Sequence, residues 1–180
     1  RNAPPLRWLL ITHYHIDHAG GAERTRRLTR ASVATHRREA EAFVAHKSKR
    51  LARLYTASTA PDLFLSDGDS LPVLDGLRII HTPGHTPGSL SFHLEERGVL
   101  FTGDMFVRYG DSLTQPFLGP ESNLGDYADS LRRLAALKPK VLLPGHGYTI
   151  YTRATEMLDE MAPRGRPGIS VLRRLMNWGT

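Results

Sequence analysis

The chain contains no cysteine among its 180 residues, which excludes disulfide bonds, thiolate metal sites and a cysteine nucleophile. It also lacks any apolar run close to the roughly 20 residues that a membrane-spanning helix needs. Low-complexity and coiled-coil patterns are absent, and 40% of the residues are hydrophobic. We therefore expect a globular domain with no membrane segment, in which His and carboxylate side chains must hold any metal ion.

Lysine is scarce, with four residues against 20 arginines, and the net charge is +6. Ten of the 24 cations lie between Arg24 and Arg53. Such a stretch can form a basic face that attracts an anionic substrate, a phosphate backbone or a membrane surface. The simpler interpretation, a solvated helical face in a protein from an arginine-preferring proteome, is the one we favour.

Apolar runs and helical patterns alternate along the chain, which favours the α/β class. The expected strands are Trp8–Thr12, Ser32–Thr35, Leu77–His81, Ser89–Leu94, Val99–Thr102 and Lys140–Leu143. The expected helices are Ala22–Arg30, residues 37–55, Asp126–Leu137 with Asn123 as its N-cap, and Thr152–Met161. We expect a long loop at Tyr109–Gly125, one domain over residues 1–162, and a linker or tail over 163–180 that ends in a short helix.

Three of the nine histidines fall within six residues, in the motif His13-Tyr14-His15-Ile16-Asp17-His18. The motif directly follows a predicted buried strand and precedes the Gly20-Gly21 pair. Strand ends fix the backbone of metal ligands, and imidazole with carboxylate suits Zn²⁺, Mn²⁺ or Fe²⁺. The spacing allows His13 and His15 to face one ion while Asp17 and His18 face a second.

Three further candidate ligands share this local setting, namely His85, Asp104 and His146. Each follows a predicted strand and has a glycine immediately before it, which lets the backbone pack close to a ligand. The ends of strands are where α/β proteins place their ligand sites. We therefore expect these residues to join the histidine motif. His36, His46, His81 and His93 are expected to be ordinary polar residues, with His36 and His81 close enough to support the ligands.

In its ordered set of motifs the chain resembles the metallo-β-lactamase superfamily over about residues 8 to 150. The resemblance implies an αββα sandwich with a dinuclear metal centre at one edge. It implies that His13, His15 and His85 hold one ion, that Asp17, His18 and His146 hold the second, and that Asp104 bridges both. Members of the family normally have several strands before the first histidine strand, whereas seven residues precede Trp8, so we expect the domain to lack its first strands.

The same resemblance implies hydrolysis by a hydroxide that bridges two divalent ions, most readily Zn²⁺, with Fe or Mn as the alternatives. Such a pair, roughly 3.5–4 Å apart, lowers the pKa of a shared water toward about 7. Asp17 and Asp104 are the expected catalytic carboxylates, the first for proton transfer and the second for spacing the ions. Arg108 and Tyr109 are candidates for substrate contact, with packing inside a loop as the competing interpretation.

The expected substrate is a small acyl compound, a carboxylic thioester, ester or lactone, because the segments around His85 and Asp104 look like those of glyoxalase II-like and lactonase-like members. A nuclease or phosphodiesterase of the same fold is the alternative, since the basic stretch would suit a phosphate backbone. Few aromatic residues interleave those cations, so nucleic acid is not favoured. An iron-dependent sulfur dioxygenase is a lesser alternative. No targeting segment is recognisable, and we expect a cytoplasmic protein.

Overall fold

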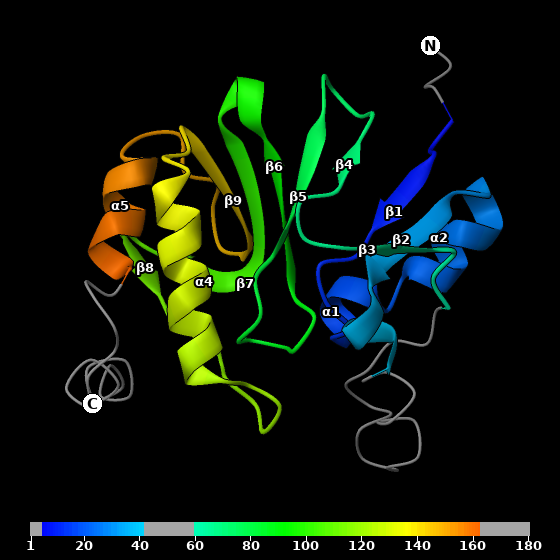
Figure 1. Ribbon diagram of the computed structural model, residues 1–180, viewed down its shortest axis with the longest axis horizontal. Coiled ribbons are helices and arrows are strands. Elements are labelled where there is room, and N and C mark those ends of the chain that lie inside the picture. The colour runs from blue at the N-terminus through cyan, green and yellow to red at the C-terminus, as the bar shows by residue number, and fades with distance from the viewer. Residues whose placement is uncertain (1–4, 42–59, 163–180) are drawn as a thin grey trace.

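The computed structural model describes residues 5–41 and 60–162, which form two β-sheets with helices on the outer faces (Figure 1). The smaller sheet has three parallel strands in the order β1-β2-β3. These strands are β1 (Trp8–Leu10), β2 (Ser32–His36) and β3 (Leu63–Leu65). The sequence predicted the first two. The third was missed because its three residues are all apolar. Leu63 and Phe64 are apolar although they are partly exposed, so the sequence shows none of the alternation typical of a half-buried strand.

The larger sheet has the strand order β4-β5-β6-β7-β8, with β9 on the other side of β7. Its strands are β4 (Ser70–Leu71), β5 (Leu77–His81), β6 (Leu90–Leu94), β7 (Val99–Tyr109), β8 (Ser112–Thr114) and β9 (Val141–His146). All neighbours are antiparallel except β7 and β9, which run parallel. A parallel pair needs a long crossover, and α4 (Leu124–Ala136) lies in that crossover.

Two predictions about this sheet were wrong. The strand expected to end at Thr102 continues to Tyr109, because the chain passes through an irregular register at Gly103 instead of leaving the sheet. Residues expected to form a loop from Tyr109 include β8, a three-residue strand too short to show any periodicity. The predicted strand at Lys140–Leu143 is confirmed and extends through His146.

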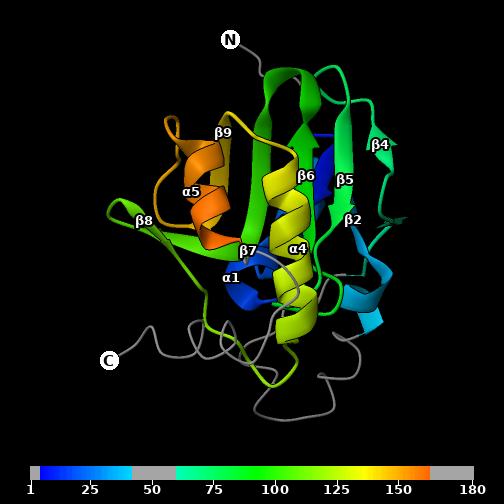
Figure 2. The same ribbon diagram turned by 60° about the vertical axis from the view of Figure 1, so that its left-hand side comes forward.

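The helices form the outer layers. The short α1 (Ile16–Ala19) and α2 (Ala22–Thr29) lie beside the small sheet, and α4 and α5 (Ala154–Met161) cover the large sheet (Figures 1 and 2). The Asn123 side chain caps α4 as predicted, accepting hydrogen bonds from the amides of Gly125 and Asp126. Residues 37–41 begin the helix predicted over 37–55, and the rest of that prediction lies outside the described residues.

Two hydrophobic cores hold these layers together. One lies between the large sheet and helices α4 and α5, and includes Leu100, Phe106, Leu131 and Leu158. The other lies between the two sheets, where β6 directs Leu90, Phe92 and Leu94 toward the small sheet. The order helix, sheet, sheet, helix confirms the predicted αββα sandwich (Figure 1).

The remaining expectations about organisation concern segments with little structural description. The predicted tail over 163–180 and residues 42–53 of the basic stretch between Arg24 and Arg53 lie outside the described residues. Within the described part of that stretch, Arg26 pairs with Asp62 and Arg27 with Glu23. Among the helices that the structure describes, none has both the length and the apolar character needed to cross a bilayer.

Candidate metal centre

The histidine motif occupies the turn between β1 and α1. His13 and Tyr14 are buried, and His15 stands at the N-cap of α1 with extended backbone angles. Asp17 and His18 then lie in the single turn of α1 itself. The change from extended to helical backbone at His15 lets residues on both sides of it direct side chains to one region, although the motif spans six positions.

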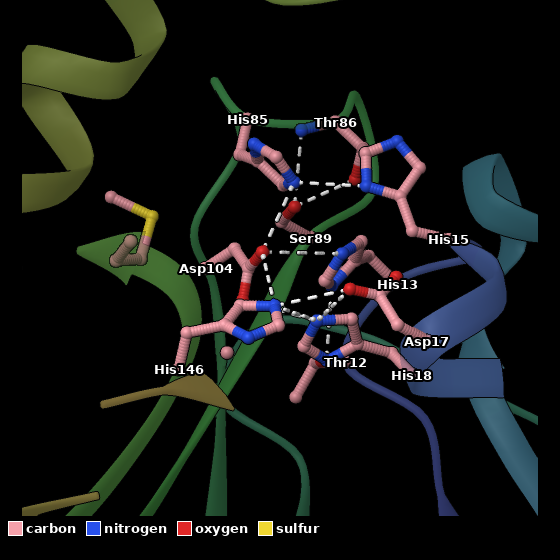
Figure 3. Close-up of polar contacts among 12 residues, drawn as sticks. Thr12, His13, His15, Asp17, His18, His85, Thr86, Ser89, Asp104 and His146 are labelled. Carbon is pink, nitrogen blue, oxygen red and sulfur yellow. Dashed lines mark hydrogen bonds and ion pairs between the residues drawn. The ribbon is translucent and has the colours of Figure 1, made fainter. Parts of the chain in front are cut away.

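The three other candidate ligands approach from the large sheet. His85 lies in the turn between β5 and β6, Asp104 lies inside β7, and His146 ends β9. Figure 3 shows these side chains meeting the motif from the opposite side, with the carboxylate of Asp104 between the imidazoles. All seven candidates named from the sequence therefore meet at one edge of the sandwich, between the two sheets.

The nitrogen and oxygen atoms of these side chains form three overlapping groups, in each of which the donor atoms lie within 4.8 Å of one another. The first group joins His13, His15 and His85, where His85 Nε2 lies 3.0 Å from His15 Nδ1. The other two groups are His13 with His18 and Asp104, and Asp17 with His18 and His146. Each group has the three protein ligands that a metal ion with an open coordination position requires.

The carboxylate of Asp104 lies close to histidines from all three donor groups. Its Oδ1 lies 3.2 Å from His18 Nε2. Its Oδ2 lies 3.5 Å from His146 Nε2, 3.7 Å from His85 Nε2 and 4.0 Å from His13 Nε2. A single carboxylate therefore faces four imidazoles that belong to different donor groups.

Burial sets the charge of these groups. Burial, followed by the nearby His18, lowers the pKa of His13, and burial followed by His15 lowers the pKa of His85 to about 4. Burial would also lower the pKa of His18, but contact with Asp104 outweighs it and raises that pKa. His13 and His85 are consequently neutral near pH 7, which is the form that binds metal ions.

The donor chemistry of this cluster fits divalent cations. His13 Nδ1 is hydrogen-bonded to Thr12 Oγ1 at 3.1 Å, which leaves Nε2 facing the cluster. Within the described part of the chain that buried Nε2 has no hydrogen-bond partner. A buried polar atom left unpaired costs about 1–3 kcal/mol, so a cation that binds it removes a real penalty. Neutral imidazoles around a carboxylate are the ligands of zinc and of iron or manganese.

Comparison with known proteins agrees with this geometry. The family model described as the metallo-beta-lactamase superfamily matches residues 1–146. The chain belongs to the metallo-β-lactamase superfamily. The resemblance drawn from the seven residues in the sequence is thereby confirmed, and so is the fold that it implied.

Two superfamily relatives carry names that describe an acyl substrate. One is a hydroxyacylglutathione hydrolase of Cereibacter sphaeroides, 35% identical over 146 residues that cover 79% of this chain and 49% of the relative. The other is the human acyl-coenzyme A thioesterase MBLAC2, 33% identical over 161 residues that cover 76% of this chain and 54% of the relative. The chain thus spans about half the length of these relatives.

A solved structure of another protein has a similar fold. The protein TTHA1623, determined in a di-iron-bound form, superposes with a TM-score of 0.70 at 26% sequence identity. The match covers 89% of this chain and 77% of that one.

Two acidic residues around the centre were missed by the sequence analysis. Glu39, from the helical residues 37–41, is 2% exposed and accepts hydrogen bonds from Tyr14 N, Thr86 Oγ1 and Gly88 N. Burial raises the pKa of Glu39 to about 7, against the opposing effect of these donors. Glu39 thereby links the His13–His18 turn to the turn that carries His85. No local pattern marks it, since its partners lie 25 to 49 residues away.

The second is Glu121, in the segment before α4. Its Oε1 lies 3.1 Å from His15 Nε2. The sequence analysis expected only a loop here, and no signal in the sequence separates Glu121 from the other acids of the chain.

Arg108 and Tyr109 lie at the end of β7. Arg108 donates hydrogen bonds to the carbonyl oxygens of Gly110 and Thr149, contacts that tie the β7–β8 turn to the segment after β9. Tyr109 is 80% exposed. The Arg108 side chain therefore holds backbone carbonyls of two connecting segments, and substrate contact by either residue stays a prediction.

His36 and His81, named as residues that support the ligands, contact each other instead. Their rings stack with centroids 4.2 Å apart, and His81 Nε2 lies 3.0 Å from the carbonyl oxygen of Pro87. That carbonyl belongs to the turn that carries His85, so His81 contacts the ligand turn without contacting a ligand side chain.

Proposed function

We propose that the protein hydrolyses carboxylic thioesters of small molecules, with esters and lactones as chemically related substrates, and that it requires two divalent metal ions. The observation that carries the proposal is the convergence of seven donor side chains into three overlapping groups around Asp104. Two relatives named for thioester hydrolysis support the substrate class. Their names identify the bond and leave the acyl group and the thiol of this protein's substrate open to test.

We assign His13, His15 and His85 to one ion and Asp17, His18 and His146 to the other. The grouping of donor atoms in space supports this assignment, because the first and third of the three groups contain these residues. We assign Asp104 to both ions, since its carboxylate lies within 4.0 Å of His18 and His146 from one assigned site and of His13 and His85 from the other.

Exposure distinguishes the two sides of the cluster. The side chains of His13, His85 and Asp104 are 1%, 4% and 8% exposed. Those of His15, Asp17 and His146 are 23%, 53% and 43% exposed. The cluster therefore has a buried floor and an open face, and we propose that the acyl group approaches from the open face.

Two bound divalent ions would supply acidification of water and polarisation of the acyl oxygen. Asp17 is the residue we assign to proton transfer. Its carboxylate is the most exposed of the seven candidate ligands, and its Oδ2 lies 3.1 Å from His146 Nε2, which fixes its orientation. It can take up the proton released when water adds to the acyl carbon and return it to the departing thiolate, so that one water and one thioester yield an acid and a thiol.

A substrate panel tests the proposal. The zinc-loaded protein is assayed with a hydroxyacyl-glutathione, an acyl-coenzyme A, a lactone and bis-p-nitrophenyl phosphate. We expect turnover of at least one thioester, and loss of that turnover after chelation and in the His13→Ala variant. Cleavage of the phosphodiester alone would contradict the proposal and favour the nuclease alternative.

We propose zinc as the resident metal, because imidazole and carboxylate ligands suit it and no thiolate is available. Elemental analysis of the protein as purified tests this, with about two zinc ions per chain expected. One tightly held iron per chain would contradict it and favour a dioxygenase.

A further inference from the structure

Glu121 contacts the outer nitrogen of a candidate ligand. His15 directs Nδ1 toward the cluster, 3.0 Å from His85 Nε2, and directs Nε2 away from it, 3.1 Å from Glu121 Oε1. Figure 3 shows the His15 ring turned with one nitrogen toward His85. The neutral imidazole ring has one N–H and one lone pair, so the partner of one nitrogen decides what the other can bind.

A carboxylate can only accept a hydrogen bond, so its partner on His15 must be the protonated nitrogen. Contact with Glu121 therefore places the proton on Nε2 and the lone pair on Nδ1. The lone pair then points to the place where His13, His15 and His85 gather their donor atoms. A carboxylate that accepts a hydrogen bond from the outer nitrogen of a metal-bound histidine also fixes the plane of the ring. It raises the basicity of the inner nitrogen, which then binds the metal ion more strongly.

The backbone around Glu121 is held against the same ligand turn. Ser122 Oγ donates a 2.7 Å hydrogen bond to the carbonyl oxygen of His85, and Asn123 N donates a 2.9 Å hydrogen bond to that of Gly84. Asn123 in turn caps α4. Gly119 leaves room for the carboxylate, since a Cβ at that position would come within 2.7 Å of Glu121 Oε2. Glu121 is thus carried by a segment anchored on both the His85 turn and a helix.

We propose that Glu121 is a positioning residue of the metal centre, which selects Nδ1 of His15 as the metal-binding atom and holds the ring in place. The inference rests on the metal-binding part of the proposed function and does not depend on the substrate. Glu121 belongs to none of the three donor groups found among the described residues, so its role is to orient a ligand and not to bind the ion.

The first test measures zinc binding by titration of the metal-free protein. Glu121→Leu keeps the bulk and removes the acceptor, and we expect it to weaken one of the two zinc sites by about 10- to 100-fold. Glu121→Gln keeps an oxygen acceptor and should restore most of that loss. Glu96→Gln removes an exposed charge distant from the cluster and should bind zinc as the unaltered protein does. Unchanged zinc affinity in a folded Glu121→Leu variant would overturn the proposal.

The second test reads the proton directly, by long-range ¹H–¹⁵N correlation of histidine side chains in the zinc-loaded protein. We expect His15 to carry its proton on Nε2 in the unaltered protein and in Glu121→Gln. A proton on Nδ1 in the unaltered protein would overturn the proposal, whatever its hydrolytic activity. Absence of thioester hydrolysis with the expected zinc affinities and tautomer would instead count against the proposed substrate alone.

Discussion

Asp104 Oδ1 lies 3.2 Å from His18 Nε2, so that a carboxylate of β7 and an imidazole of α1 meet between the two sheets. Burial on its own would raise the pKa of Asp104, but contact with His18 outweighs it and lowers that pKa. The carboxylate is therefore ionised at neutral pH although the Asp104 side chain is only 8% exposed. A charge buried to this extent needs positive partners, and cations beside it would supply them.

Replacement of Asp104 tests this relationship. Asp104→Ala should reduce the bound metal from about two ions to one or fewer, because the same carboxylate faces donor atoms of both assigned sites. Metal content is measured by elemental analysis after gel filtration. Asp159→Ala, an exposed change on α5, serves as the control and should bind metal as before. Two retained ions in Asp104→Ala would show that the carboxylate does not bridge.

Gly145 gives a test that changes no charge. A Cβ at this position would collide with Asp104 Oδ1 and come within 2.6 Å of His18 Cε1. Gly145→Ala should therefore displace one of these side chains and weaken metal binding by at least about tenfold, with the β9 strand still formed. Isothermal titration with zinc measures the change. Gly68→Ala is unsuitable as a control because its φ is +83°, whereas Gly21→Ala meets no neighbouring atom and should bind zinc normally.

Glu39→Gln tests the acidic link between the two ligand turns. The glutamine amide has one oxygen and one NH₂ group, whereas Glu39 accepts through both oxygens. The NH₂ group of glutamine must therefore face the N–H of either Tyr14 or Gly88, and two donors cannot form a hydrogen bond. We expect the free energy of unfolding to fall by about 1–3 kcal/mol. Urea denaturation measures this, and amide exchange at Tyr14 and Gly88 should accelerate. The exposed neighbour Glu41 gives the matched control Glu41→Gln, which should leave stability unchanged.

The stacked pair His36 and His81 predicts a loss of stability in acid. Burial, followed by the charge of His81 and of Arg38, lowers the pKa of His36 from 6.5 to about 4. Below pH 6.5 His36 binds a proton in the unfolded chain but stays neutral in the folded protein. The contribution of neutral His36 to the free energy of unfolding therefore declines as the pH falls toward 4. Above pH 6.5 it is fully present.

His36→Phe removes the titrating group and keeps a ring that can stack on His81. Urea denaturation of the metal-free variant between pH 7 and 4.5 should show a smaller loss of stability than the unaltered protein. The variant loses the hydrogen bond from Arg38 N to His36 Nδ1 at every pH, so the comparison concerns the slope and not the absolute value. An identical slope in the two proteins would contradict the assignment.

The convergence of the candidate ligands was predictable because their signal is local. Three histidines and an aspartate in six residues after an apolar run mark a candidate metal-binding turn without knowledge of the fold. The glycines before His85, Asp104 and His146 also indicated that the backbone packs closely at these positions. Gly145 packs against Asp104 and His18, and Gly103 has a φ of +51° with Thr12 against it, so close backbone approach is the physical reason for both.

Other features depend on contacts that no local pattern encodes. The end of β7 was misplaced because Gly103 reads as a strand terminus, whereas its positive φ produces a register shift inside the strand. In the sequence, nothing around Glu39 or Glu121 distinguishes them from the other acidic residues of the chain. Their partners lie 25 to 106 residues away along the chain, and only the folded arrangement brings them to the metal turn.

The attachment of Ser122 and Asn123 to the turn of His85 restricts how this scaffold can evolve. Insertions between the end of β8 and Gly119 are compatible with these contacts, because that part of the connection precedes the anchored residues. Insertions further on would pull a histidine out of place. Length variation in this connection is therefore expected before Gly119, whereas the residues from Ser122 onward should keep their spacing.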